Sequence, residues 1–211
     1  MGRLLTPSDC DRLWAAWAPA EVSERLSGLT APWYVAAGWA LDLFLGSEGR
    51  RHGDVEIGVP SARFGEVVEA LPGFEWDVAG DGRIWPYPEA AADHHQTWLR
   101  DPATGLYRLD VFRETQRDGR WVCRRSASIT LPYDELILHT EKAIPYAAPE
   151  VALLFKAKAL RQKDESDFAR VLPRLDRSRR SRLHAWLSTV HPGHPWLDRL
   201  PTGTPTGRSP S

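Results

Sequence analysis

The sequence predicts an α/β or α+β domain that is followed by a C-terminal helical subdomain. In the first two thirds of the 211 residues, short apolar strand patterns alternate with helical stripes. From about Pro149 onward the apolar residues follow helical spacing, which indicates two or three helices. Strands interleaved with helices and then helices alone are typical of such a mixed architecture.

The N-terminal quarter of the chain is expected to hold three helices and one buried strand. In order, they are a helix from Thr6 to about Pro19 that carries Leu13, Trp14 and Trp17, a helix over 20–26, a strand over 33–36, and a helix that Gly38 opens and Gly46 ends. Proline in the first turn and glycine at the end are the signals that set these helix boundaries.

The segment Asp54-Val55-Glu56-Ile57-Gly58-Val59 shows the clearest strand pattern. Its apolar side chains fall on one face, and the carboxylates of Asp54 and Glu56 fall on the other. Further elements are expected downstream: a helix that starts after Pro60-Ser61 and reaches Leu71, and strands over 74–78, 96–99, 106–112 and 120–123. We therefore divide the chain into a catalytic domain over 1–132, a helical subdomain over 133–200 and a disordered tail over 201–211.

Composition excludes some classes of function. Lys and Arg number 27 against 28 Asp and Glu, so the net charge of −1 excludes a globally basic nucleic-acid coat, though not a local basic groove. No stretch approaches the roughly 20 apolar residues of a membrane span. Cys10 and Cys123 lie far apart outside any metal-ligand motif, as expected of reduced thiols. We expect a cytoplasmic protein without a membrane partner.

Three carboxylates carry the chemical signal. Asp54 and Glu56 at positions i and i+2 of a strand can share divalent cations. Asp110 interrupts the apolar run Leu109-Asp110-Val111-Phe112, where a charge is costly unless it is paired or bound to a metal. The alternatives are a solvated strand face for the first two and a salt bridge to Arg108 or Arg113 for the third. Together with the Gly38 turn at a helix N-terminus, the acids indicate a Mg²⁺-triphosphate site.

Two segments resemble the nucleotidyltransferase superfamily, in the branch of aminoglycoside 2''-adenylyltransferases and lincosamide nucleotidyltransferases. They are Trp33-Tyr34-Val35-Ala36-Ala37-Gly38-Trp39-Ala40-Leu41-Asp42 and Arg50-Arg51-His52-Gly53-Asp54-Val55-Glu56-Ile57. The similarity continues through the strand around Asp110 and into the segment 149–168, so it covers most of 30–198. The chain departs from the pattern at the first motif glycine, which is Ala37 here.

The resemblance implies a mixed β-sheet flanked by helices, two Mg²⁺ ions and transfer of a nucleoside monophosphate from an NTP, with ATP as the expected donor, to a hydroxyl group. It assigns metal binding and catalysis to Asp54, Glu56 and Asp110. It places Gly38 in the phosphate turn. The remaining residues expected to contact the nucleotide are Trp39, Arg50, His52 and Lys156. Only one of Lys156 and Lys158 is expected to point into the site, and ordinary hydrogen bonding within a loop is the alternative for His52.

The expected partner is a small polar acceptor with a hydroxyl group, with antibiotic resistance as the implied role. A cationic aminoglycoside would need an acidic pocket with aromatic walls, and the residues available to edge one are Glu75, Asp77, Trp85, Asp93, His94, His95 and Trp98. Exposed loop acids and core tryptophans are the simpler interpretation of the same residues.

Two rival functions stay open. The first is a transferase acting on tRNA or protein, as in toxin and antitoxin systems, for which the basic run Arg174, Arg177, Arg179, Arg180 and Arg182 could contact RNA. A solvated helix face explains that run more simply. The second is a degenerate, non-catalytic nucleotide-binding member, which Ala37 favours and which the retained Asp110 argues against.

Overall fold

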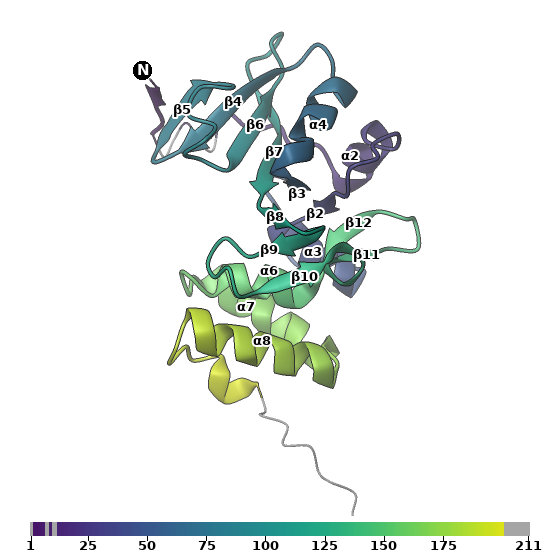
Figure 1. The fold of residues 1–211 in the computed structure, drawn as a ribbon, viewed down its shortest axis with the longest axis vertical. Coiled ribbons are helices and arrows are strands. Elements are labelled where there is room, and N and C mark those ends of the chain that lie inside the picture. The colour runs from purple at the N-terminus through teal and green to yellow at the C-terminus, as the bar shows by residue number, and fades with distance from the viewer. Residues whose placement is uncertain (1, 7–8, 10–11, 201–211) are drawn as a thin grey trace, which may run out of the picture. The chain divides into compact units, whose positions relative to one another are not determined.

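The computed structural model describes residues 2–6, 9 and 12–200, which form two compact units, Met1–Ala148 and Pro149–Ser211 (Figure 1). The tail expected over 201–211, the helix start at Pro7-Ser8 and the thiol of Cys10 lie outside the described residues. Cys123 is a buried, free cysteine. No helix in the described part of the chain is long and apolar enough to cross a membrane.

The first unit is built on a mixed sheet in the order β1-β5-β4-β6-β7-β3-β2-β12-β11. Its strands are β1 (Arg3–Leu4), β2 (Tyr34–Val35), β3 (Glu56–Pro60), β4 (Glu75–Gly80), β5 (Arg83–Pro86), β6 (Gln96–Arg100), β7 (Tyr107–Glu114), β11 (Ile137–His139) and β12 (Pro145–Ala147). The pairs β3–β7 and β2–β12 are parallel, and the others are antiparallel. A second, antiparallel sheet holds β8 (Gln116–Arg117), β9 (Arg120–Val122) and β10 (Thr130–Pro132).

The helices of the first unit are α2 (Pro19–Arg25), α3 (Ala37–Leu45), α4 (Phe64–Ala70) and α5 (Tyr133–Leu136), with a 3₁₀ turn η1 (Ser61–Arg63) before α4. The helix α3 ends at Gly46, whose φ of 70° gives the left-handed C-cap that glycine favours. Figure 1 shows α2 and α4 side by side, and Glu66 of α4 accepts hydrogen bonds from Thr30 just beyond α2 and from Arg63.

The two faces of the large sheet differ in polarity. On one face the apolar side chains of Ile57, Val59, Leu99, Leu109 and Val111 are fully buried, and the Trp76 ring of β4 packs edge-on against Phe64 of α4 with centroids 5.1 Å apart. On the other face, the register partners Glu56–Asp110 and Asp110–Trp98 line up across β3, β7 and β6. Because register partners project to the same face, this second face carries the polar groups of the site.

The predicted mixed α/β fold is confirmed, but the first helix is wrong beyond residue 12. Residues 13–17 instead run alongside β7: the amide of Tyr107 donates to Leu13 O at 2.7 Å, and the amide of Ala15 donates to Tyr107 O at 3.0 Å. The physical reason is the late start of β3, which first meets β7 opposite Asp110. The edge of β7 before that point is left for another segment, and these hydrogen bonds outweigh helical propensity.

The two units divide between Ala148 and Pro149, so the boundary expected after residue 132 lies earlier in the sequence than the structural division. The segment between these positions adds α5, β11 and β12 to the first unit, and Tyr146 of β12 pairs with Val35 of β2. Strands of two or three residues leave too little alternation to be predicted from sequence. The strand β5 was likewise not expected.

The second unit contains the helices α6 (Pro149–Lys156), α7 (Gln162–Val171) and α8 (Arg177–Val190), with 3₁₀ turns η2 (Leu172–Arg174) and η3 (Leu197–Arg199). Its core includes Phe168 of α7 stacked on Trp196, with centroids 4.1 Å apart. The carboxylate of Glu150 is fully buried and accepts hydrogen bonds from Arg179 at 2.8 and 2.9 Å and from Arg182 at 3.2 Å. This ion pair joins α6 to α8.

We predict that Glu150→Gln lowers the free energy of unfolding by about 3 kcal/mol, because a buried ion pair is strongly destabilised when one partner loses its charge. The measurement is urea denaturation followed by circular dichroism. Asp198→Asn is the control, since Asp198 is an exposed acid of the same unit. Equal stability of the two variants would show that the arginines do not depend on this carboxylate.

Candidate active site

The strands β3 and β7 bring two of the predicted acids together. Glu56 opens β3 and lies opposite Asp110 in the parallel pairing, and the amide of Asp110 donates to Val55 O at 2.9 Å. The apolar partners Val55, Ile57 and Val59 are fully buried, as the alternation predicted. Asp54 precedes the strand, two residues before Glu56, and its negative charge acts on Asp110.

Asp110 is the most deeply buried of the three acids, with 4% of its surface exposed. Its Oδ2 accepts a hydrogen bond from Gln96 Nε2 at 2.8 Å, while its Oδ1 is buried and accepts none from the described residues. Burial raises the pKa of Asp110 to about 7, the hydrogen bond from Gln96 opposes this rise, and the charge of Asp54 adds to it. The carboxyl group therefore titrates near neutral pH.

The acids fit a divalent cation only when a substrate completes its coordination. Within the described residues, no three acidic, histidine or cysteine side chains converge closely enough to hold a metal by themselves. Mg²⁺ is commonly held by one or two carboxylates together with substrate phosphates and water. The buried Oδ1 of Asp110 and the repulsion between Asp54 and Asp110 are what such a cation would relieve.

The turn into α3 brings the predicted phosphate-binding residues together. A Cβ atom at Gly38 would lie 2.4 Å from Arg50 Nη2 and 2.7 Å from His52 Cε1, so only glycine allows this close approach. Arg50 thus lies against the first turn of α3. A guanidinium and a helix N-terminus side by side favour an anion at this position.

His52 and Trp39 connect this turn to the acidic strand. His52 Nε2 lies 2.7 Å from Asp42 Oδ2 of α3, with both side chains 3% exposed, and the His52 ring stacks on Trp39 with centroids 4.4 Å apart. The indole of Trp39 donates to Asp54 O at 3.1 Å. These contacts fix the backbone of Asp54 to α3, which gives His52 and Trp39 a positioning role within the structure.

Lys156 lies in the second unit, where its ammonium group is buried between two carboxylates. Its Nζ is 2.8 Å from Asp167 Oδ2 and 3.4 Å from Asp164 Oδ1. The pKa of Asp164 is lowered by the hydrogen bond from Arg161 and the charge of Lys156, which together outweigh its burial. Contact between Lys156 and a nucleotide stays a prediction.

Three polar residues near the site were given no role of their own in the sequence analysis. Gln96 is a lone amide in a short strand, and only the β6–β7 register places it beside Asp110. Arg124 lies 4.9 Å from the Phe112 ring, pairs with the buried Glu114 at 2.8 Å and lowers the pKa of Asp110. Asp42 was detectable in principle, because it is an acid within the apolar stripe of α3.

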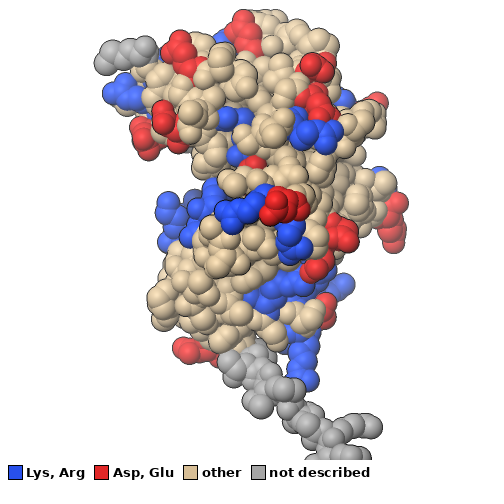
Figure 2. All heavy atoms as spheres, in the orientation of Figure 1, with Lys and Arg blue, Asp and Glu red and all other residues tan. Residues whose placement is uncertain are grey.

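The acidic pocket expected for a polycation does not form from Glu75 and Asp77. Arg100 pairs with both acids, at 2.6 Å to Glu75 Oε2 and 2.8 Å to Asp77 Oδ2, and the hydroxyl of Tyr107 also donates to Asp77. Their charges are thus largely compensated. The face in Figure 2 shows acidic and basic side chains interspersed, in keeping with the net charge of −1.

The basic run of α8 is also largely used within the structure. Arg179 and Arg182 pair with the buried Glu150, and Arg180 donates to Leu175 O at 2.9 Å. These arginines therefore stabilise the second unit. The observation favours the structural interpretation of the run over contact with RNA.

Comparison with solved structures identifies the class of fold. No protein-family model and no curated protein matches the chain. Solved structures do match, and they show that the fold is that of antibiotic nucleotidyltransferases, the branch that the sequence resembles.

The neighbours are distant from this chain in sequence. The lincosamide antibiotic adenylyltransferase LnuA, lincomycin-bound, is 18% identical with a TM-score of 0.52 over 81% of this chain and 98% of that chain. ANT(2'')-Ia in complex with adenylyl-2''-tobramycin is 14% identical with a TM-score of 0.53 over 81% and 95%. The solution structure of the antibiotic-resistance factor ANT(2'')-Ia is 13% identical with a TM-score of 0.54 over 81% and 89%.

The raised pKa of Asp110 predicts how stability depends on pH in metal-free protein. The folded-state pKa of about 7 lies above the ordinary value of 3.8, so ionisation of this group destabilises the fold as pH rises between these values. We expect the stability advantage of Asp110→Asn over wild type to grow by about 2 kcal/mol between pH 5 and pH 8. Urea denaturation in EDTA measures it, and a pH-independent difference would contradict it.

The left-handed backbone conformation of Ala37 predicts that glycine at this position would stabilise the turn into α3. Its φ of 49° is in the left-handed region, which costs an L-residue roughly 1 kcal/mol relative to glycine. We expect Ala37→Gly to raise the free energy of unfolding by about 1 kcal/mol. Ala40→Gly, in the interior of the same helix, is the control and should lower it. Destabilisation by both would show that Ala37 is unstrained.

Proposed function

We propose that the protein is a Mg²⁺-dependent nucleotidyltransferase that moves a nucleoside monophosphate from an NTP, with ATP as the expected donor, to a hydroxyl group of a small polar acceptor. The observation that carries the proposal is the arrangement of Asp110. A buried carboxylate with one unpartnered oxygen lies opposite Glu56 and within electrostatic reach of Asp54. A protein with no use for a cation there would gain stability from an apolar residue.

The residues of the site would have different roles in this reaction. The first turn of α3 at Gly38 and the guanidinium of Arg50 would hold the phosphates of the donor. Asp54, Glu56 and Asp110 would hold Mg²⁺, which neutralises phosphate charge and acidifies the attacking hydroxyl when bound. Asp110 has a pKa near neutrality, so its carboxylate can orient or accept the hydroxyl proton. The contacts of Trp39 with Asp54 O and of His52 with Asp42 hold the acidic strand in place against α3.

The acceptor class rests on the structural neighbours. LnuA is described as lincomycin-bound and ANT(2'')-Ia as bound to adenylyl-2''-tobramycin, so both are described with an antibiotic or its adenylylated form. We therefore propose a small-molecule acceptor, with antibiotic modification in the cytoplasm as the role. Fold likeness supports the reaction more strongly than the acceptor, because one scaffold serves many substrates.

The test is pyrophosphate release from each of the four NTPs with Mg²⁺, in the presence of lincomycin, tobramycin or tRNA. We expect release that depends on Mg²⁺ and on one small-molecule acceptor. Asp54→Asn and Asp110→Asn should each lower the rate by at least about a hundredfold, because each removes charge from the metal site. Glu141→Gln, at an exposed acid, should leave it unchanged.

The other outcomes point to the rival functions. Release that requires tRNA and falls steeply with salt would replace the small-molecule acceptor with nucleic acid. Full activity in Asp54→Asn or Asp110→Asn would overturn the assignment of the site. A chain that binds no NTP in the presence of Mg²⁺ would be a degenerate scaffold.

A further inference from the structure

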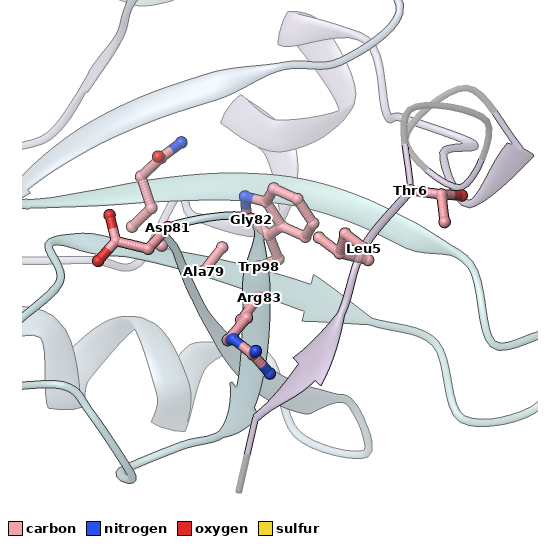
Figure 3. Close-up of a pocket in the computed structure, with 9 residues that line it drawn as sticks. Leu5, Thr6, Ala79, Asp81, Gly82, Arg83 and Trp98 are labelled. Carbon is pink, nitrogen blue, oxygen red and sulfur yellow. The ribbon is translucent and has the colours of Figure 1, made fainter.

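A cavity of about 330 Å³ lies beside the β4–β5 hairpin and β6 of the large sheet (Figure 3). Three segments line it: the N-terminal chain at Leu5 and Thr6, the β4–β5 hairpin from Ala79 to Arg83, and β6 at Gln96 and Trp98. The register aligns Ala79 with Gln96 and Trp98 with Asp110, so these side chains share one face. This volume is at the lower end of the range for small-molecule sites.

The cavity adjoins the carboxylate of Asp110 through two of its lining residues, Gln96 and Trp98. The amide of Gln96, which lines the cavity, donates its hydrogen bond to Asp110 Oδ2 at 2.8 Å. The other oxygen of Asp110 is left without a partner among the described residues. A hydroxyl group on a molecule held in the cavity would thus approach Asp110 past Gln96.

The lining of the cavity indicates the chemistry of its ligand. Leu5, Ala79 and Trp98 provide apolar surface, and the close-up in Figure 3 shows Leu5 and Trp98 next to each other. The charged residues of the lining are one acid, Asp81, and one base, Arg83. Their charges cancel, and Arg100 neutralises the acids of β4. A polycation would find no excess of negative charge here.

We infer that this cavity is the acceptor site, and that it takes an uncharged or singly charged hydroxyl compound with an apolar face rather than a polycation. The inference rests on the proposed nucleotidyl transfer and adds the acceptor's place and charge. The apolar face of the acceptor packs against Trp98 and Leu5. Its hydroxyl group points past Gln96 to Asp110.

The test compares Leu5→Ala with Leu4→Ala. Leu5 lines the cavity, whereas its neighbour Leu4 is 61% exposed and does not, so the pair separates loss of the cavity wall from loss of any leucine. Calorimetric titration with methyl glucoside, adenosine, lincomycin and tobramycin, in the presence of Mg²⁺ and a non-hydrolysable ATP analogue, measures each dissociation constant. We expect Leu5→Ala to weaken binding of an uncharged or singly charged compound by about tenfold, and Leu4→Ala to leave it unchanged.

A second measurement needs no variant. In an amide NMR spectrum of the wild-type protein, the bound compound should shift the signals of Gly80 and Gly82 in the β4–β5 hairpin. Gly119, in a hairpin turn outside the cavity, should not shift.

Three results would overturn the inference: binding of tobramycin alone, binding of none of the four compounds, or equal effects of the two leucine variants with no shift at Gly80 and Gly82. Failure of the proposed function is a separate result. It would appear as absence of Mg²⁺-dependent binding of the ATP analogue to the wild-type protein.

Discussion

The parallel pairing of β3 with β7 is the constraint on which the rest of the site depends. It sets Glu56 opposite Asp110 and turns both acids to the face away from the apolar core. The core on the opposite face holds the register in place, because a slip by one residue would bury Glu56 and expose Ile57. The stability of hydrophobic packing therefore holds two like charges close together on adjacent strands, which no local interaction favours.

The second element of the site is tied to the first by contacts over short sequence distances. The pair Asp42–His52 and the hydrogen bond from Trp39 to Asp54 O both connect α3 to the loop before β3. Gly38 is required because Arg50 and His52 pack where a Cβ would stand. The turn into α3 and the acidic strand consequently form one connected structure, so a change in either would move the other.

The features that could be predicted from the sequence are those set by local interactions, and the features that could not be predicted depend on residues far apart in the chain. The alternation around Asp54 and Glu56, the helix between Gly38 and Gly46, and the exceptional position of Asp110 all have local signatures, and the structure contains each element. The role of Gln96 depends on the pairing of β6 with β7, which no local pattern encodes. The path of residues 13–17 was mispredicted for the same reason, since hydrogen bonds to Tyr107 decide it.

This division explains why the fold suggests the reaction more firmly than the acceptor. The acids lie on the neighbouring strands β3 and β7, and the turn with Gly38 opens the helix α3. The positions of these groups therefore follow from the sheet itself. The cavity beside Asp110 needs an N-terminal segment and a hairpin that lie far apart in the sequence and are joined by the pairing of β1 with β5. At 13–18% identity such packing can change while the sheet is retained, as the TM-scores of 0.52 to 0.54 indicate. In the acceptor site that we propose, the charge and shape of the acceptor therefore follow from Leu5, Asp81, Arg83 and Trp98, whereas the neighbours support only the class of small-molecule acceptor.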